Sequence, residues 1–418
     1  MILLISGCGI EKPVELAISK EPLDRQDDRV EIVLATMRHP EDTQGIDNEI
    51  QNAAACFNRY SNRYHVKVVD YMQEGATDKE SALRRLNTEI AAGNYPDMIC
   101  FSQISPFPFL SKGLLLDMEE CIAEDELINA DDIIAKKALC SFGGLYFLGS
   151  NVTVDTMIAD YSRFGDNYGW SLAEYLKIEA QADPGTWMIY NITPEIFLDR
   201  VSRRYTCTAI NWNSGTCNFN NQDFVDILKA SERIAKPEAG NDELYGFTGT
   251  LISEGKIIAG VSISDQVYSF AINEQDAGGK LSYIGWPTID GSCGTDIRFQ
   301  HPVGIVTKSD HIEGCWEFIK YLLKDEDVSY GIPVYKPRLL ERIEDAKKKE
   351  DPFEQMSPDQ AARFLDLLDN IDHLAIYDET VMGIVMEESA DFFAGYRSAE
   401  ETASIIQSKV NLYLSEMQ

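Results

Sequence analysis

The side chains that could do chemistry in this chain are polar and aromatic residues placed where predicted strands end. Arg38 follows a strand that starts at Val30, and Phe101 and Gln103 follow or close another that starts at Met98. Planar polar side chains can bond hydroxyl groups in pairs, and flat aromatic faces cover apolar C–H surfaces. These residue types favour binding of a small polar molecule. A solvated surface arginine and a core phenylalanine remain the alternatives.

Sequence signatures of catalysis are weak or missing. Carboxylates are so abundant that a glycosidase pair could be placed almost anywhere, so that signal has no specificity. The chain has no G-x-S-x-G, Walker or GxGxxG motif. Its histidines lack the spacing of zinc ligands. They are His39, His65, His301, His311 and His373. We therefore expect no catalytic residue, no metal and no cofactor.

Composition narrows the class of protein further. The chain has 418 residues, which is more than a single hydrophobic core usually holds, so two or more lobes are expected. Its 69 acidic and 37 basic side chains give a formal charge of −32. No sustained stripe of lysine or arginine exists that could displace counterions from a phosphate backbone. Nucleic acid is therefore not an expected partner.

The N-terminus carries a possible lipid-attachment motif. An apolar run at residues 1–4 precedes Ile5, two small residues and Cys8, which is the pattern of a bacterial lipobox. In proteins with this motif the cysteine is lipidated after the leader is cleaved. The run has no charged segment and is short for a leader, so a start placed too late is one interpretation and a chance apolar terminus the other. We expect a leader remnant at 1–8, lipidation of Cys8 and a flexible linker at 9–29.

The other cysteines show no C-x-x-C spacing, and a small disulfide scaffold is excluded by the length of the chain. Cys56, Cys100 and Cys315 lie within apolar patterns and are expected to be small buried side chains. Cys207 and Cys217 could bridge neighbouring strands, and the sequence leaves that disulfide open.

Hydrophobic periodicity predicts alternating strands and helices after the linker. Strands are expected at 30–34, 66–71 and 98–101, with helices between them, the second capped by Thr77 and Glu80 and ended by Gly93. The β-α-β-α-β order predicts a parallel sheet covered by helices. Ligands bind where loops leave the carboxyl ends of such strands, here at 36–40 and 102–105.

From about Leu145 the pattern indicates a second body. A short strand at 143–148 leads into a polar crossing at 149–151, and a second crossing is expected at 301–304. Asn151 could contact a ligand from this hinge or satisfy turn backbone groups. Further strands are predicted at 257–263 and 281–286. Helices are predicted at 170–180, around 315–323 and 364–371, and at 399–413, where Ser398 and Glu401 form a capping box. The picture is two α/β lobes joined by several crossings.

Four stretches resemble a known family when taken together. They are residues 91–99, a glycine-x-x-proline-aspartate-apolar segment; residues 111–117; residues 313–322, with a glycine, a small residue and Trp-Glu-Phe; and residues 330–336. Their order and spacing are similar to those of the extracellular solute-binding proteins of bacterial ABC importers, in the carbohydrate-binding class called family 1. Members of this class often have tryptophan directly after the proline-aspartate strand, where this chain has Phe101 and Ser102.

The resemblance implies a two-lobed periplasmic-binding-protein-like fold of type II. Each lobe would be a mainly parallel sheet flanked by helices, with the ligand cleft at the hinge. The expected domains are 30–150 plus 304–343 and 151–303 plus 344–418. It also implies a monomer without covalent chemistry, held at the extracellular face of the membrane by its lipid or free in the periplasm. Its partners would be a small carbohydrate and the permease subunits of an ABC transporter.

The resemblance also suggests binding residues in the second body. Asp265, Gln266 and Tyr268 follow a strand where the family usually places ligand contacts, although an Asx-turn could equally use Asp265. Tyr377 precedes a helix in a position resembling a ligand-stacking aromatic of the family. Trp286 ends a strand and could stack on ligand or seal the hinge. Trp316 is predicted to be core, whereas Trp170, Trp187 and Trp212 could not be sorted.

The sequence thus predicts a lipid-anchored receptor that captures a carbohydrate, most simply an oligosaccharide, and delivers it to an ABC importer. An extracytoplasmic enzyme acting on polysaccharide is the first alternative. A sensory lipoprotein of the same fold, partnered by a kinase, is the second.

Overall fold

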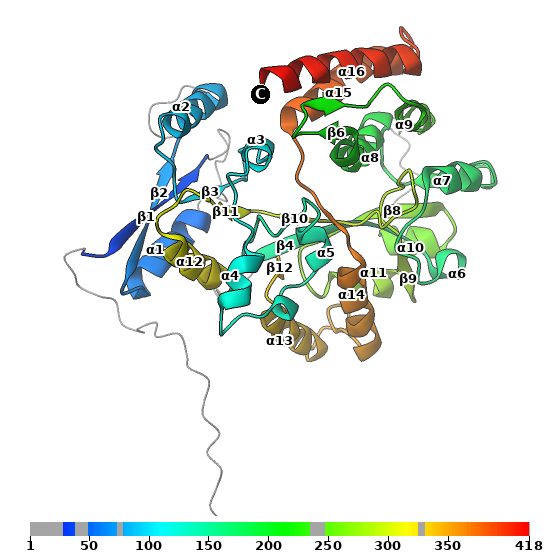
Figure 1. The fold of residues 1–418 in the computed structure, drawn as a ribbon. Coiled ribbons are helices and arrows are strands. Elements are labelled where there is room, and N and C mark those ends of the chain that lie inside the picture. The colour runs from blue at the N-terminus through cyan, green and yellow to red at the C-terminus, as the bar shows by residue number, and fades with distance from the viewer. Residues whose placement is uncertain (1–27, 38–48, 73–77, 235–246, 325–330, 418) are drawn as a thin grey trace, which may run out of the picture.

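The computed structural model describes residues 28–37, 49–72, 78–234, 247–324 and 331–417. Two sheets, each flanked by helices, form its two lobes (Figure 1). Arg38, Thr77, Cys8 and nearly all of the predicted linker lie outside the described residues. No helix in the part of the chain that the structure describes is long and apolar enough to cross a membrane.

The first sheet has the strand order β11-β3-β1-β2. β1 pairs in parallel with both β2 and β3, whereas β11 runs antiparallel to β3. The strands are β1 (Val30–Thr36), β2 (Tyr64–Asp70), β3 (Met98–Cys100) and β11 (Val303–Ile305). The helices beside them are α1 (Glu49–Tyr60), α2 (Lys79–Ala91) and α12 (Ile312–Lys324). The predicted β-α-β-α-β unit is therefore confirmed.

The second sheet has the order β13-β10-β4-β8-β5, and β9 and β12 also pair with β4. Its strands are β4 (Asn151–Asp160), β5 (Trp187–Ile189), β8 (Ile257–Ser264), β9 (Leu281–Tyr283), β10 (Asp296–Phe299), β12 (Ile332–Pro333) and β13 (His373–Leu374). The expectation of a mainly parallel sheet describes the first sheet, whereas this one is mixed. The long central strand β4 runs antiparallel to β8, β9, β10 and β12, and only β5–β8 and β10–β13 are parallel.

The remaining helices cover both faces of the second sheet (Figure 1). On the face drawn uppermost lie α7 (Leu172–Glu179), α8 (Pro194–Ala209), α9 (Gln222–Glu232), α15 (Glu379–Phe393) and α16 (Ala399–Glu416). On the other lie α10 (Thr248–Ser253), α11 (Ser269–Ala277), α13 (Lys336–Lys347) and α14 (Pro358–Asn370). Short elements complete the chain: α3 (Phe107–Ser111), α4 (Glu119–Glu124), η2 (Ala130–Asp132), α5 (Lys136–Leu139), α6 (Tyr161–Phe164), β6 (Ile210–Asn211) and β7 (Thr216–Cys217).

The chain passes between the sheets more than once. Leu148 forms a bridge with Val303 of the first sheet, and β4 of the second sheet begins at Asn151. Near this point the chain returns, since β10 ends at Phe299 and β11 starts at Val303. The two crossings lie against each other, because a Cβ on Gly149 would meet the carbonyl oxygen of His301 at 2.9 Å. Only Leu148 of the strand predicted at 143–148 forms a sheet contact.

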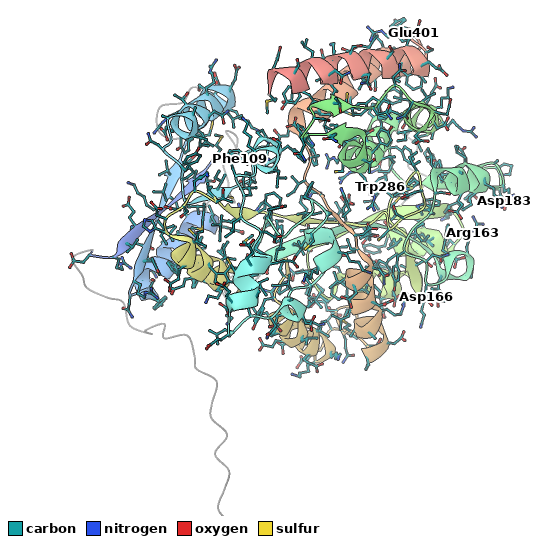
Figure 2. All side chains as sticks on the ribbon, viewed as in Figure 1. Phe109, Arg163, Asp166, Asp183, Trp286 and Glu401 are labelled. Atoms are coloured by element: carbon teal, nitrogen blue, oxygen red, sulfur yellow. The ribbon has the colours of Figure 1, made fainter. Side chains whose placement is uncertain are left out.

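Two apolar clusters hold these layers together. One spans the first sheet, α1, α12 and the lower face of the second sheet, and includes Trp316, which is buried as predicted. The other lies between the upper face of the second sheet and α7, α8, α9, α15 and α16, and includes Trp170 and Trp286. Figure 2 shows Trp286 between the sheet and these helices.

Helix caps and cysteines settle several smaller predictions. The capping box at Ser398 and Glu401 is confirmed. The box at the start of α2 is formed by Asp78 and Ser81, one residue later than predicted, because the Asp78 side chain accepts from the Ser81 N–H at 2.7 Å. Cys207 and Cys217 are both free thiols, so the disulfide left open by the sequence does not form.

Candidate binding cleft between the two lobes

A cavity of about 430 Å³ lies between α3 of the first lobe and the end of α8 in the second. Both lobes line it, and we call this space the cleft. From the first lobe come Phe107, Leu110, Ser111, Phe142 and Tyr146; from the second come Cys207, Thr208, Ile210, Asn211, Trp212 and Asn213. Aromatic rings and short polar side chains thus face the same space from two directions.

One side of α8 carries the polar residues that lead from the second sheet up to the cleft. Arg200, Arg203 and Cys207 recur at helical spacing, so they share one face, and Asn211 continues the line beyond the helix end. The helix begins where the Thr193 side chain accepts the Ile196 N–H, with Pro194 in the first turn. It ends as the chain enters the β6–β7 hairpin, whose turn holds Trp212.

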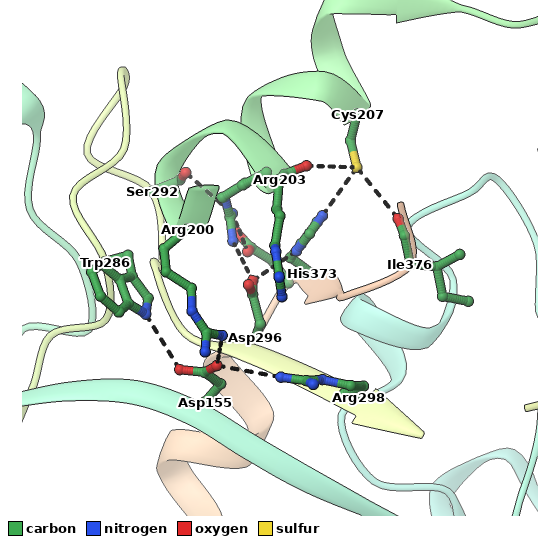
Figure 3. Close-up of polar contacts among 12 residues, drawn as sticks. Asp155, Arg200, Arg203, Cys207, Trp286, Ser292, Asp296, Arg298, His373 and Ile376 are labelled. Carbon is green, nitrogen blue, oxygen red and sulfur yellow. Dashed lines mark hydrogen bonds and ion pairs between the residues drawn. The ribbon is translucent and has the colours of Figure 1, made fainter. Parts of the chain in front are cut away.

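Near the N-terminal half of α8, the carboxylate of Asp155 in β4 contacts three side chains. The carboxylate pairs with Arg200 and with Arg298 at 3.5 Å, and accepts the indole N–H of Trp286 at 3.3 Å (Figure 3). Burial raises the pKa of Asp155, and the charge of Arg200 and the hydrogen bond from Trp286 offset this only in part.

This part of the second sheet opens toward solvent. Ile263 of β8 lies directly opposite Asp155 in the ladder, so both side chains are on the same face. Ile263 is nevertheless 53% exposed, although β8 is a strand of a helix-covered sheet. This face of the sheet is therefore open at Ile263, whereas Asp155 beside it is buried.

A second polar cluster lies behind Cys207, a residue that lines the cleft (Figure 3). The Sγ atom of Cys207 is 3.2 Å from Nε2 of His373, whose Nδ1 is 2.7 Å from the carboxylate of Asp296. Arg204 contacts Asp372 at 2.5 Å and lies 3.7 Å from Asp296. Burial alone would lower the pKa of His373, but the charges of Asp296 and Cys207 and hydrogen bonds to both outweigh burial and raise it.

Contacts between side chains also join the two lobes. The rings of Phe107 and Trp212 stack with centroids 4.3 Å apart. The Ser105 hydroxyl donates to Asp378 at 2.7 Å, and Lys79 forms an ion pair with Glu379. The first lobe supplies one partner of each contact and the second lobe the other.

None of the predicted site residues that the structure describes lines the cavity itself, but two of them, Trp286 and Tyr377, contact arginines of α8. Trp286 is buried, and the guanidinium carbon of Arg200 lies 6.0 Å from its ring centroid. Tyr377 lies against the guanidinium of Arg203, 4.4 Å from its ring centroid. Asn151 is buried as the first residue of β4. Gln103 is half-buried after β3.

The others lie elsewhere or serve packing. Phe101 is buried in the first lobe, edge-on to Phe109 and Phe147. Asp265 and Gln266 follow β8, and the Asp265 carbonyl accepts the Gly331 N–H at 2.9 Å. The Tyr268 ring is half-buried with the ammonium of Lys349 5.1 Å from its centroid.

Several cleft residues were not singled out from the sequence. The sequence does not sort Trp212 from the other tryptophans, and it predicts no role for Phe107 or Tyr146. The run Pro106-Phe107-Pro108-Phe109 just after a strand end is a local signal for an aromatic rim. The spacing of Arg200, Arg203 and Cys207 is a signal for a polar helix face.

Comparison with known proteins gives structural likeness only. No family model matches the chain, and no curated relative does. An extracellular solute-binding protein of family 1 from Alicyclobacillus acidocaldarius is 15% identical, with 93% of this chain and 100% of that one covered and a TM-score of 0.52.

Two further solved structures are similar. The sugar-binding protein MalE from Xanthomonas citri is 14% identical, covering 93% of this chain and 98% of its own, with a TM-score of 0.55. The cyclic alpha-maltosyl-1,6-maltose binding protein from Arthrobacter globiformis is 12% identical, covering 93% and 100%, with a TM-score of 0.51. The chain therefore has the two-lobed fold of the extracellular solute-binding proteins, as the motifs in its sequence predicted.

Proposed function

We propose that this protein is a receptor that captures an oligosaccharide between its two lobes and delivers it to the permease of an ABC importer. The observation that carries the proposal is the cleft itself. Its volume, about 430 Å³, is in the range of small-molecule sites, and both lobes supply aromatic and polar lining residues. Binding without covalent change to the ligand is the activity proposed.

The lining chemistry suits a sugar. Tyr146 and the stacked pair of Phe107 and Trp212 offer aromatic surface to the C–H faces of a pyranose, and the amides of Asn211 and Asn213 can bond its hydroxyls. Ser111 and Thr208 add hydroxyl groups that can both donate to and accept from a neutral, hydroxyl-rich ligand.

Contacts from both lobes also give a mechanism. A ligand that touches Tyr146 of the first lobe and Asn211 of the second binds the closed arrangement better than an open one. It therefore shifts the population toward closure by the difference between its two affinities. The permease would recognise the closed surface.

The named neighbours guide the choice of probes. Among structures with the same fold are a sugar-binding protein and a receptor for a cyclic maltosyl-maltose. Linear and cyclic glucose oligosaccharides are therefore the first ligands to test here.

Isothermal titration calorimetry and thermal unfolding test the proposal directly. A bound oligosaccharide should give saturable heat and raise the midpoint of unfolding by a few degrees. Trp212→Ala should weaken binding about 5-fold, since it removes aromatic surface worth about 1 kcal/mol. Tyr396→Ala is the matched control, because Tyr396 is an aromatic residue that is 81% exposed. It lies just before the start of α16, whereas Trp212 lies near Leu414 at the end of that helix.

The outcome separates the alternatives. A shift with peptides or polyamines alone would contradict the carbohydrate assignment. Consumption of the sugar, followed by chromatography over hours, would favour the polysaccharide-active enzyme. The membrane anchor is a separate part of the proposal and rests on the lipobox. Cys8→Ala should move the expressed protein from the membrane fraction to the soluble fraction.

A further inference from the structure

Cys207 is the one thiol among the residues that line the cleft. It is half-buried and lies in the last turn of α8, between the polar face of that helix and the β6–β7 hairpin. A small molecule that enters the cleft therefore meets this sulfur.

The groups behind Cys207 are arranged as nucleophile, base and orienting acid. Sγ is 3.2 Å from Nε2 of His373, and Nδ1 of the same ring is 2.7 Å from Oδ1 of Asp296. His373 and Asp296 come from neighbouring strands, β13 and β10, that pair at these two residues. The carboxylate holds the imidazole with Nε2 toward the sulfur, which is the geometry that activates a thiol. Figure 3 shows the three side chains in line.

Paired charges lie around the Cys207–His373 contact. On α8, Arg200 pairs with Asp155, Arg203 pairs with Asp199, and Arg204 lies between Asp296 and Asp372. The carbonyl oxygens of Arg203 and Ile376 are 3.7 and 3.9 Å from Sγ, farther than the ring nitrogen. The C-terminal end of α8 favours a cation beside it, which agrees with the raised pKa of His373.

We propose that Cys207 is a nucleophilic thiol that undergoes exchange with low-molecular-weight disulfides entering the cleft, with His373 as its proton acceptor and Asp296 as the residue that positions the imidazole. In the exchange, the Cys207 proton moves to Nε2, and the thiolate attacks one sulfur of the disulfide. A new S–S bond forms, and the old one breaks with its electron pair on the leaving sulfur. That sulfur takes the proton from Nε2, so the products are a mixed disulfide on Cys207 and one free thiol.

The surroundings favour this reaction over acyl transfer. An acyl substrate develops a negative oxygen that needs hydrogen-bond donors. Apart from the His373 ring, the polar groups in contact with the sulfur are the carbonyl oxygens of Arg203 and Ile376, which are acceptors. Disulfide exchange develops charge only on sulfur. Among the described residues, no group of three or more histidine, cysteine, aspartate or glutamate side chains could hold a metal ion.

Cys217 provides an internal control. It is also a half-buried free thiol of the second lobe, but its side-chain neighbours are the amides of Gln407 and Asn411. Burial raises the pKa of Cys217 to about 11, and the hydrogen bond with Gln407 offsets this only partly. Its reactivity should therefore follow the small fraction of thiolate that pH allows.

The test is the rate of modification of each cysteine by dithiobis-nitrobenzoate in the folded, full-length protein, read by peptide mass spectrometry. From about pH 8 to about pH 6 the rate at Cys217 should fall ~100-fold, because its thiolate fraction falls tenfold per pH unit. The rate at Cys207 should fall less than ~10-fold over the same range. Parallel falls at the two cysteines would overturn the proposal without any variant.

Two substitutions assign the roles. His373→Gln should give Cys207 the steep pH profile of Cys217, whereas Cys207→Ser should remove the pH-insensitive labelling and leave Cys217 unchanged. Circular dichroism and the unfolding midpoint check that each variant is folded. A flat profile at Cys207 in folded His373→Gln protein would show that the histidine has no part in activation. If His373→Gln fails to fold, the comparison of Cys207 with Cys217 in the unmodified protein decides.

Discussion

The rings of Phe107 and Trp212 stack almost parallel across the two lobes, with centroids 4.3 Å apart and planes 8° from each other. Phe107 opens α3 of the first lobe, and Trp212 lies in the turn of the β6–β7 hairpin of the second. Both residues also line the cleft. Two rings of the cleft lining therefore hold the lobes to each other.

This stack predicts a shift in lobe closure. Phe107→Ala removes an aromatic pair worth about 0.5–1.5 kcal/mol, so the ratio of open to closed molecules should rise about 2- to 13-fold. Small-angle scattering or a fluorophore pair with one dye on each lobe measures the change. Phe353→Ala removes a ring that is 52% exposed and outside the cleft lining, and should leave the distribution unchanged. An unaltered distribution in Phe107→Ala would show that the stack does not hold the lobes.

Ser105 and Asp378 allow closure to be separated from stability. Ser105 donates to one oxygen of Asp378 at 2.7 Å, while the other oxygen accepts the N–H groups of Thr380 and Val381 and caps α15. Ser105→Ala should raise the open population and change the free energy of unfolding by less than about 0.5 kcal/mol. Asp378→Ala should cost about 1–3 kcal/mol, since it removes a buried cap as well. Urea unfolding measures both, and equal costs would contradict the division of roles.

Local patterns in the sequence were sufficient for much of the fold. The capping box at Ser398 opens α16, and the apolar stripe through Trp316 becomes the buried side of α12. Both follow from residues within one or two helical turns, which is why spacing alone predicts them. The polar segments at the crossings were also visible, because they interrupt apolar runs on either side.

The site was harder to predict, because it depends on residues far apart in the chain. Phe101 ends a parallel strand, where ligands commonly bind, yet Phe109 and Phe147 pack on its ring and make it core. Nothing near Trp212 in the sequence indicates that Phe107 lies against it. Asp155 sits inside a long apolar strand, and only the pairing of β4 with β10 and the packing of α8 show its partners.

The glycine of the Trp-Glu-Phe motif gives a third prediction. A Cβ on Gly314 would lie 2.6 Å from the ring of buried Tyr64, so α12 can approach β2 this closely only with glycine there. Gly314→Ala should destabilise the protein by about 1–3 kcal/mol through overpacking. Gly383→Ala is the matched control within α15, where nothing lies within 4 Å of the new methyl group. That variant should be stabilised by up to about 1 kcal/mol. The urea midpoint of each variant measures its change in stability. An unchanged midpoint in Gly314→Ala would refute the packing argument.

Glu388 in α15 predicts how stability depends on pH. Its carboxylate bonds Lys409 of α16 and Arg397, the latter at 2.8 Å. The hydrogen bond from Lys409 lowers the pKa of Glu388, burial opposes the change, and Arg397 adds to the lowering. Because the folded pKa is below the unfolded one, the stabilisation is present above the ordinary glutamate value of about 4.3 and is lost as pH falls through the folded pKa.

Glu388→Gln should therefore be less stable than the unmodified protein at neutral pH, by about 1–3 kcal/mol, because two charge-assisted hydrogen bonds are weakened. The difference should shrink as the pH is taken below about 4, since the unmodified protein loses the same interactions when Glu388 is protonated. Urea unfolding at a series of pH values measures it. Glu387→Gln removes an exposed neighbouring charge and should stay within about 0.5 kcal/mol of the unmodified protein. A difference for Glu388→Gln that is constant from neutral to acid pH would mean that it arises from packing of the side chain, since packing does not titrate.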